Sequence, residues 1–120
     1  MPTLERVQAF IARVEAREYI DALVEFYHED VVVQENFGDT RKSRDALIAH
    51  EIDITARFGS VPVRKVERFA VNGDLVFINW VFTLQPKEGA ARTLDEVVMQ
   101  VWRDDRIAWE RFYYDPGTIR

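Results

Sequence analysis

The 120-residue sequence contains no cysteine and only two histidines, and it has few residues that break regular structure, with five glycines and four prolines. The absence of cysteine excludes a disulfide framework, a thiolate nucleophile and a cysteine-ligated metal site. Two widely separated histidines do not have the spacing of a zinc site, and the scattered carboxylates lack the pattern of a calcium loop. We therefore expect a protein that uses neither a metal nor a cofactor.

The sequence also lacks the motifs that bind phosphate or build a serine nucleophile. It has no glycine-rich phosphate loop and no G-x-S-x-G turn, and its only serines are Ser43 and Ser60. A formal net charge of −5 argues against nucleic acid or an anionic membrane as a partner. No apolar run is long enough to cross a bilayer, and the first ten residues carry charges where a signal peptide needs an apolar stretch. We expect a cytoplasmic protein.

The residues that are present are typical of a globular chain, with 48% hydrophobic and 31% charged residues. A chain of this length supplies one core but not two, so we predict one domain over residues 1–120. Apolar residues at spacings of three and four predict helices over residues 4–16, 19–27 and 44–58. Thr3 and Ser43 are suited to cap the first and third of these helices, and Gly59 to end the third.

A short β-branched strand over residues 31–33 is expected after the second helix, which we predict to end in an acidic turn over residues 28–30. Side chains alternate along a strand, so Glu35 should lie on the same face as Val31 and Val33. A carboxylate at the end of an apolar row is a placement that favours proton transfer. Residues 37–42 are predicted to form a loop.

Four more strands are predicted in the second half, in meander order. The Asn72-Gly73 and Asp104-Asp105 pairs are typical hairpin tips, and a tail from Asp115 should leave the sheet. The predicted strands cover residues 61–71, 75–84, 93–103 and 106–114.

This order of elements predicts an α+β fold with the helices on one face of a curved antiparallel sheet. The strand over residues 75–84 is apolar on both faces. One face can pack on the helices, whereas the chain has nothing left to cover the other. We therefore expect a homodimer through the outer sheet face.

Three segments resemble a known superfamily: FYHEDVVV at residues 26–33, SRDAL at 43–47 and RFYYDP at 111–116. On these segments the chain is similar to the SnoaL-like polyketide cyclase and ketosteroid isomerase group of the nuclear transport factor 2-like superfamily. The resemblance implies a cone-shaped barrel, a curved and mainly antiparallel sheet wrapped around three N-terminal helices. This fold carries isomerases, cyclases, dehydratases, epoxide hydrolases and non-catalytic binders, so it does not choose a function.

The resemblance also implies site positions. The catalytic base of the isomerases matches Glu35, but their two oxyanion donors fall near Phe10 and Val98, which carry no suitable group. One carboxylate of the epoxide hydrolases falls at Phe112. These departures make a steroid isomerase or an epoxide hydrolase of the usual kind a poor match.

We take Glu35, His50 and Glu110 as the candidate catalytic residues. Glu35 would accept or relay a proton, and His50 or Glu110 would donate or orient. Each has a structural alternative: Glu35 paired with an arginine, His50 as a core histidine, and Glu110 paired across the sheet. Glu96 and Gln100 share the predicted pocket face with Glu110 by alternation. The candidate substrate-binding residues are Phe10, Val14, Tyr27, Val33, Ile54, Trp80, Val98, Gln100, Trp102, Phe112 and Tyr114.

Three functions remain open at this point. The first is general acid–base catalysis on a small apolar metabolite that bears a carbonyl or hydroxyl group, by isomerisation, cyclisation or hydration. The second is a non-catalytic domain that binds a small apolar ligand in the same cavity. The third is a dimeric interaction module.

Overall fold

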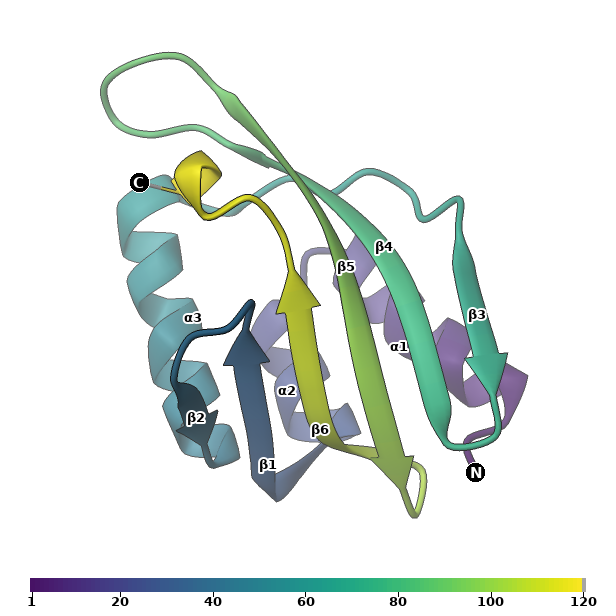
Figure 1. Cartoon of the computed structure of the whole chain (residues 1–120). Coiled ribbons are helices and arrows are strands. Elements are labelled where there is room, and N and C mark those ends of the chain that lie inside the picture. Colours follow the sequence, from purple (N-terminus) through teal and green to yellow (C-terminus); the bar gives the residue numbers. More distant parts are fainter. Residues whose placement is uncertain (120) are drawn as a thin grey trace.

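A computed structural model of the chain describes residues 1–119 (Figure 1). Three α-helices, six strands and a final 3-10 helix follow one another along the chain. Their order is α1 (Leu4–Glu15), α2 (Tyr19–Phe26), β1 (Tyr27–Glu35), β2 (Thr40–Lys42), α3 (Arg44–Phe58), β3 (Phe69–Asn72), β4 (Leu75–Leu84), β5 (Arg92–Arg103), β6 (Arg106–Tyr113) and η1 (Pro116–Ile119).

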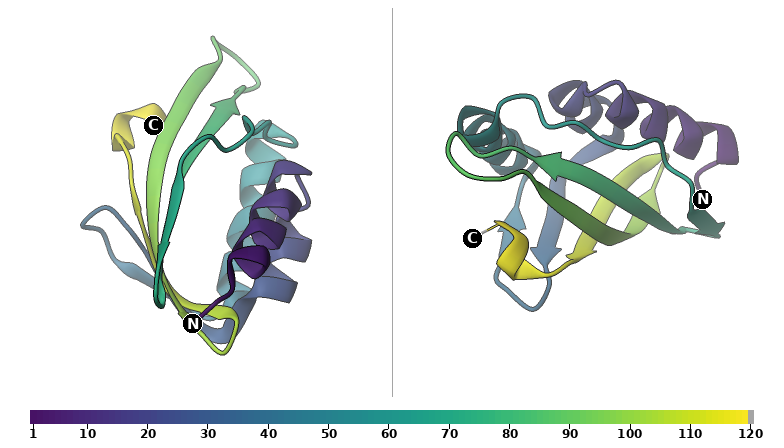
Figure 2. Two further views of the ribbon diagram at one scale, coloured as in Figure 1. Left: turned by 90° about the vertical axis from the view of Figure 1, so that its right-hand side faces the viewer. Right: turned by 90° about the horizontal axis from the view of Figure 1, so that it is seen from above.

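The six strands form one sheet in the order β2-β1-β6-β5-β4-β3. The pairing of β1 with β6 is parallel and every other pairing is antiparallel. The sheet curves around the three helices, which all lie on its inner side (Figure 2). The predicted α+β fold with a curved, mainly antiparallel sheet is therefore confirmed. Since β2 and β3 are both free edges, the sheet is an open cone and not a closed barrel.

The helices begin and end where the sequence predicts, to within a residue. Thr3 accepts a hydrogen bond from the amide of Arg6, and Ser43 accepts one from the amide of Ala46 at 3.2 Å. Gly59 ends α3 with a φ of +74°, a conformation that favours glycine. Helix α2 stops at Phe26, and the predicted acidic turn after it is instead the irregular first part of β1.

Two predictions in the connecting segments were wrong. The predicted loop over residues 37–42 contains the short edge strand β2, whose residues pair with β1 from Val32 to Gln34. The predicted strand over residues 61–71 is regular only as β3. Before β3 the chain is extended but joins β4 irregularly, with one bridge between Val63 and Phe82. Pro62 has no amide hydrogen for a continuous ladder.

Both predicted hairpins are present. The first turns at Gly73-Asp74, one residue later than predicted, because Asn72 still pairs with Leu75. The second turns at Asp104-Asp105, where both residues have positive φ.

Phe10 of α1 lies at the centre of the core. Its ring makes edge-on contacts with four other aromatic rings at centroid distances of 5.4 to 6.0 Å, those of Phe26, Tyr27, Trp80 and Trp102. These contacts pack α1 against α2, β1, β4 and β5. Three of these rings, those of Phe10, Tyr27 and Trp80, also line the cavity described below.

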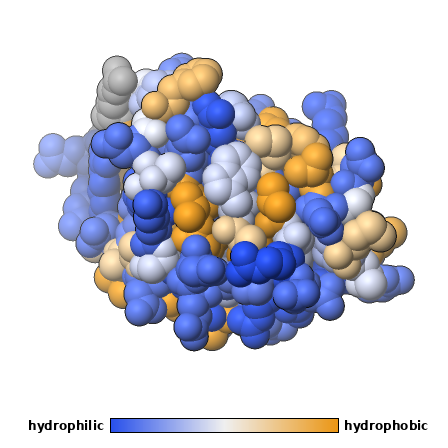
Figure 3. Space-filling model, turned by 60° about the horizontal axis from the view of Figure 1, so that its bottom comes forward, coloured by the Kyte–Doolittle hydropathy of each residue, from blue (hydrophilic) through white to orange (hydrophobic). Residues whose placement is uncertain are grey.

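The outer face of the sheet exposes several large apolar side chains. Leu75, Phe77, Val97 and Tyr113 are each between 36% and 42% exposed. Apolar residues form separate groups among hydrophilic ones on the face that Figure 3 shows. Among residues 1–119, no helix is long and apolar enough to span a membrane.

Candidate functional site

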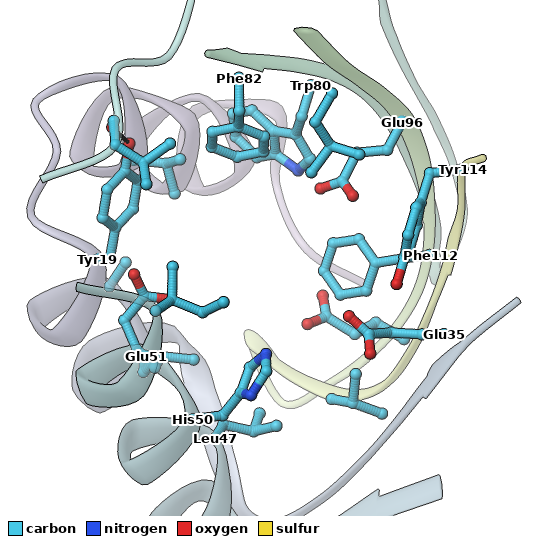
Figure 4. A pocket seen from close by; sticks show the side chains of 18 of the residues that line it. Tyr19, Glu35, Leu47, His50, Glu51, Trp80, Phe82, Glu96, Phe112 and Tyr114 are labelled. Carbon is cyan, nitrogen blue, oxygen red and sulfur yellow. Dashed lines mark hydrogen bonds between the residues drawn. The ribbon is translucent and has the colours of Figure 1, made fainter. Parts of the chain in front are cut away.

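A cavity of about 310 Å³ lies between the inner face of the sheet and the three helices (Figure 4). The three candidate catalytic residues Glu35, His50 and Glu110 all line it. So do eight of the candidate substrate-binding residues, namely Phe10, Val14, Tyr27, Val33, Ile54, Trp80, Phe112 and Tyr114.

The other three candidate substrate-binding residues do not line the cavity. Val98, Gln100 and Trp102 point to the inner side of β5, as alternation predicts, but they are buried in the core beneath the cavity. Gln100 and Trp102 nevertheless act on the cavity indirectly, through the hydrogen bonds of Glu110.

Glu110 is a buried carboxyl group held by three hydrogen bonds. The hydroxyl of Tyr27 donates to both carboxyl oxygens at 2.8 and 2.9 Å, and the side-chain amide of Gln100 donates to one of them at 2.9 Å. The indole of Trp102 donates to the Gln100 oxygen at 3.0 Å, which fixes that amide. Burial raises the pKa of Glu110 to about 7, against these hydrogen bonds from Gln100 and Tyr27, which lower it.

Glu96 is a second buried carboxyl group in the cavity wall, 7% exposed, on the strand next to Glu110. Among residues 1–119, no hydrogen-bond donor and no cation contacts its carboxyl group. Burial, and then the negative charges of Glu110, Glu35 and Asp95, raise the pKa of Glu96 to about 8. The carboxyl group points into the cavity (Figure 4).

Glu35 lies at the end of β1 and is paired with an arginine. The guanidinium of Arg41 on β2 lies 2.8 Å from the Glu35 carboxylate, and both side chains are about one-third exposed. Tyr114 stands beside this pair. Burial, followed by the charges of Glu35 and Glu96, raises the pKa of the Tyr114 phenol to about 12. The phenol therefore remains a hydrogen-bond donor at neutral pH.

His50 and Glu51 bring two further ionisable groups to the cavity from α3. Burial and the nearby charge of Arg41 lower the pKa of His50, so its imidazole is neutral at neutral pH. Burial also raises the pKa of the Glu51 carboxyl. The adjacent side chains point to the same cavity from neighbouring positions of one helix (Figure 4).

Aromatic rings make up much of the remaining wall. Trp80 and Phe82 lie 6.1 Å apart between ring centroids, and Phe82 and Tyr19 lie 6.2 Å apart. Phe112 of β6 and Tyr114, which directly follows β6, face them (Figure 4). The cavity thus combines aromatic surface with four carboxyl groups, those of Glu35, Glu51, Glu96 and Glu110.

Tyr19, Arg41 and Arg57 also line the cavity and are absent from the sequence-based candidates. Tyr19 is the first residue of α2 and Arg57 lies in the last turn of α3, and helical periodicity says little about which way a side chain at a helix end faces. Arg41 lies on the strand that was predicted as a loop. Among residues 1–119, no group of three or more His, Asp or Glu side chains is arranged to hold a metal ion.

The profile of the SnoaL-like domain family matches residues 7–110. The chain belongs to this family. The SnoaL-like domain is therefore identified over nearly the whole chain, including the strands that carry Glu35, Glu96 and Glu110. A comparison with curated proteins gives no match.

Solved structures agree with the SnoaL-like fold. A protein of Mesorhizobium loti, classed with SnoaL-like polyketide cyclases, is 24% identical, with a TM-score of 0.81 over 95% of this chain and 100% of that one. A Catenulispora acidiphila protein with a ketosteroid isomerase-like fold, solved with trimethylamine, is 20% identical, with a TM-score of 0.79 over 98% and 90%. TerC, co-crystallised with polyporic acid, is 19% identical, with a TM-score of 0.80 over 99% and 95%. At these identities the likeness concerns the fold alone.

Proposed function

We propose that this SnoaL-like domain is a cofactor-independent enzyme that uses general acid–base chemistry on a small, mostly apolar molecule with a carbonyl or hydroxyl group. The observation that carries the proposal is Glu110, a buried carboxyl group with a pKa of about 7 in the wall of the cavity. A general base is most effective when its pKa lies near the working pH.

In the proposed reaction Glu110 accepts a proton from a C–H or O–H group of the bound substrate. Tyr27 and Gln100 keep the carboxylate in one orientation, which lowers the cost of aligning it with the substrate. The neutral His50 and the phenol of Tyr114 are donors for the substrate oxygen on which negative charge develops. The charge of Glu35, which is paired with Arg41, helps to raise the pKa of Tyr114 and so keeps the proton on its phenol.

Glu110 can then pass the proton on in two ways. Return of the proton to a different atom of the substrate completes an isomerisation or a cyclisation, whereas its transfer to a departing hydroxyl completes a dehydration. The apolar walls support a mostly apolar substrate, and a cavity of this volume suits a small one. Structural neighbours solved with polyporic acid and with trimethylamine support the use of this fold as a small-molecule site.

Proton abstraction is measurable before the substrate is known. Apolar ketones incubated with the protein in deuterated buffer should gain deuterium next to the carbonyl, detected by mass spectrometry. The rate should rise with pH through about pH 7, since the base form of Glu110 increases over that range. Glu110→Gln should lose the exchange by roughly 100-fold or more.

The matched control is Glu67→Gln, which removes a carboxylate on the exposed segment before β3, outside the cavity. It should exchange at the wild-type rate. Full exchange by Glu110→Gln would contradict the role of Glu110 as the base.

A second candidate function, non-catalytic ligand binding, is favoured by one observation. The two isomerase-type oxyanion donors fall near Phe10 and Val98, and both side chains are buried apolar core residues here. In that case ligands would bind and no ketone would exchange deuterium.

We also propose a homodimer through the outer sheet face, where Leu75, Phe77, Val97 and Tyr113 are exposed. Light scattering after gel filtration should give twice the mass of the chain. Phe77→Glu should give a monomer, whereas Val24→Glu, at an exposed apolar position on α2, should not. A wild-type monomer at micromolar concentration would contradict the proposal. A dimer would also be compatible with the interaction module.

A further inference from the structure

Glu96 is a buried ionisable group that the proposed reaction does not use. It lies directly opposite Trp80 in the pairing of β4 with β5, so both side chains stand on the inner face at the cavity wall. Glu96 is more than nine-tenths buried, and no donor or cation among residues 1–119 contacts its carboxyl group. Its carboxyl oxygens are open to the cavity, and burial makes their ionised form costly unless a cation or a donor joins it there.

The surroundings of Glu96 suit a cation. The rings of Trp80, Phe82 and Tyr19 form a continuous row along one wall, and Phe112 and Tyr114 face them. The faces of such rings attract a positive charge, and they do so more strongly where water is excluded. An aliphatic ammonium group presents apolar methylene or methyl groups to rings of this kind and its charge to the carboxylate.

The other charges that face Glu96 do not neutralise it. Glu35 of β1, Glu110 of β6 and Glu51 of α3 add negative character to the cavity. The neutral phenol of Tyr114 and the neutral imidazole of His50 add no charge.

The two arginines in the cavity wall are already engaged. Arg41 is paired with Glu35 at 2.8 Å. Arg57 donates to the carbonyl of Ile119 and lies 4.7 Å from the ring centre of Phe58. Neither arginine of the cavity wall therefore contacts the carboxyl group of Glu96.

We propose that the molecule bound in this cavity carries an aliphatic ammonium group, held by the carboxylate of Glu96 and surrounded by the aromatic rings of the wall. The inference rests on the proposed function only in taking this cavity as the ligand site. It narrows the substrate class from a small apolar molecule to a small amine or quaternary ammonium compound.

Binding of such a cation must be coupled to a proton. Burial holds Glu96 mainly in its protonated form at neutral pH. A cation binds the ionised form, so the proton has to leave on binding, and affinity should rise as pH increases. An uncharged ligand of the same shape has no such coupling.

The probes are choline and its uncharged isostere 3,3-dimethylbutan-1-ol, which differ in charge and hardly in shape. Titration calorimetry should show choline binding that strengthens by roughly 100-fold between about pH 6 and pH 9, as expected for a pKa of about 8. Near pH 7, two buffers of different ionisation enthalpy should report close to one proton released per choline bound. The alcohol should bind no more tightly at high pH.

Glu96→Gln should remove both the preference for choline and the proton release. Asp95→Asn is the matched control, because it removes a carboxylate from the adjacent, exposed position on the other face of β5. It should keep both the preference for choline and the proton release, with the rise in affinity moved slightly to lower pH because the charge of Asp95 helps to raise the pKa of Glu96. If Glu96→Gln fails to fold, proton release by the wild-type protein at about pH 8 is the test and needs no variant, because Glu110, with a pKa of about 7, is already mostly ionised there.

Equal binding of the two probes at high pH, or choline binding without proton release, would overturn the inference. A preference for the alcohol that Glu96→Gln abolishes would also overturn it, since it would make Glu96 a neutral donor. Deuterium exchange lost in Glu110→Gln tests the proposed function separately. Either result can fail while the other holds.

Discussion

Glu110 and Glu96 are the same kind of residue at similar burial, yet their surroundings differ completely. Glu110 stands on β6 at the base of the cavity, with hydrogen bonds from Tyr27 and Gln100. Glu96 stands on β5, with none within residues 1–119. Burial dominates the pKa of both. Hydrogen bonds then lower the pKa of Glu110, to about 7, whereas the negative charges of Glu110, Glu35 and Asp95 raise that of Glu96 further, to about 8.

The difference separates a carboxyl group that the fold has satisfied from one that it has left for a ligand. A polar group whose hydrogen bonds are made is held in one orientation, and a general base needs a fixed orientation toward its substrate. An unsatisfied group lowers the stability of the empty protein, and a ligand that fills its place recovers that stability.

Removal of the Glu96 charge should have the largest effect on stability. The folded pKa of Glu96 is raised above that of the unfolded chain, so the folded state binds the extra proton and stability falls as pH rises from about 4.5 to about 8. Glu96→Gln removes this loss. It should exceed the wild type in free energy of unfolding at about pH 9 by on the order of 4 kcal/mol, measured by urea denaturation.

The two proteins should be nearly equal at about pH 5, where Glu96 is protonated in the fold. Asp95→Asn should still lose stability as pH rises, because it keeps the Glu96 carboxyl, but slightly less than the wild type, because the charge of Asp95 helps to raise the pKa of Glu96. If Glu96→Gln were no more stable than wild type at high pH, Glu96 would have a partner in solution and the contrast with Glu110 would disappear.

Tyr27→Phe should make Glu110 more like Glu96, a buried carboxyl group without hydrogen-bond donors. It removes one hydroxyl and the hydrogen bonds to both carboxyl oxygens, so the pKa of Glu110 should rise. The free energy of unfolding should fall by about 2 kcal/mol at high pH, where the carboxylate is ionised, and by less at low pH. Tyr113→Phe, which removes a hydroxyl on the outer face, controls for the substitution. An equal loss at both pH values would show that Tyr27 acts through packing alone.

Arg41→Gln should have the smallest effect on stability. The pair it forms with Glu35 is partly exposed, and such pairs contribute about 1 kcal/mol or less. The change should instead raise the pKa of His50, since the positive charge of Arg41 is one of the causes that lower it. NMR titration of the His50 ring measures this shift. An unchanged pKa would show that burial alone sets it.

The sequence was informative wherever periodicity and side-chain alternation decide the outcome. Thr3 and Ser43 were identified as helix caps because a short polar side chain before an apolar helical pattern has few other uses. The common face of Glu96, Gln100 and Glu110 followed from counting in twos, and the irregular pairing near Val101 and Trp102 did not invert it.

The sequence predicted on which face of a strand a side chain lies, but not whether that side chain reaches the cavity. Val98, Gln100 and Trp102 are on the correct side of β5, but they are buried in the core and do not line the cavity, and the ring of Phe10 packs on that of Trp102. Alternation gives the side of a strand and says nothing about which residues a helix covers.

The sequence also did not predict which residues contact one another across neighbouring strands. Strand β2 looked like a loop because it is three residues long and polar, and its pairing with β1 depends on where β1 ends. The Arg41–Glu35 pair was missed as a specific contact for the same reason. Whether Glu96 has a partner depends on the side chains of every element around it. No pattern within one strand can therefore predict that it lacks one.

The order of the hydrogen bonds from Trp102 through Gln100 to Glu110 gives that chain a direction. An indole can only donate, so the oxygen of the Gln100 amide must face Trp102 and its nitrogen must face Glu110. Exchanging that one nitrogen for oxygen, as in Gln100→Glu, would put two carboxyl groups in contact. They would have to share a single proton, as the catalytic pair of an aspartic protease does. This single substitution would therefore give the fold a pair of carboxyl groups that share one proton.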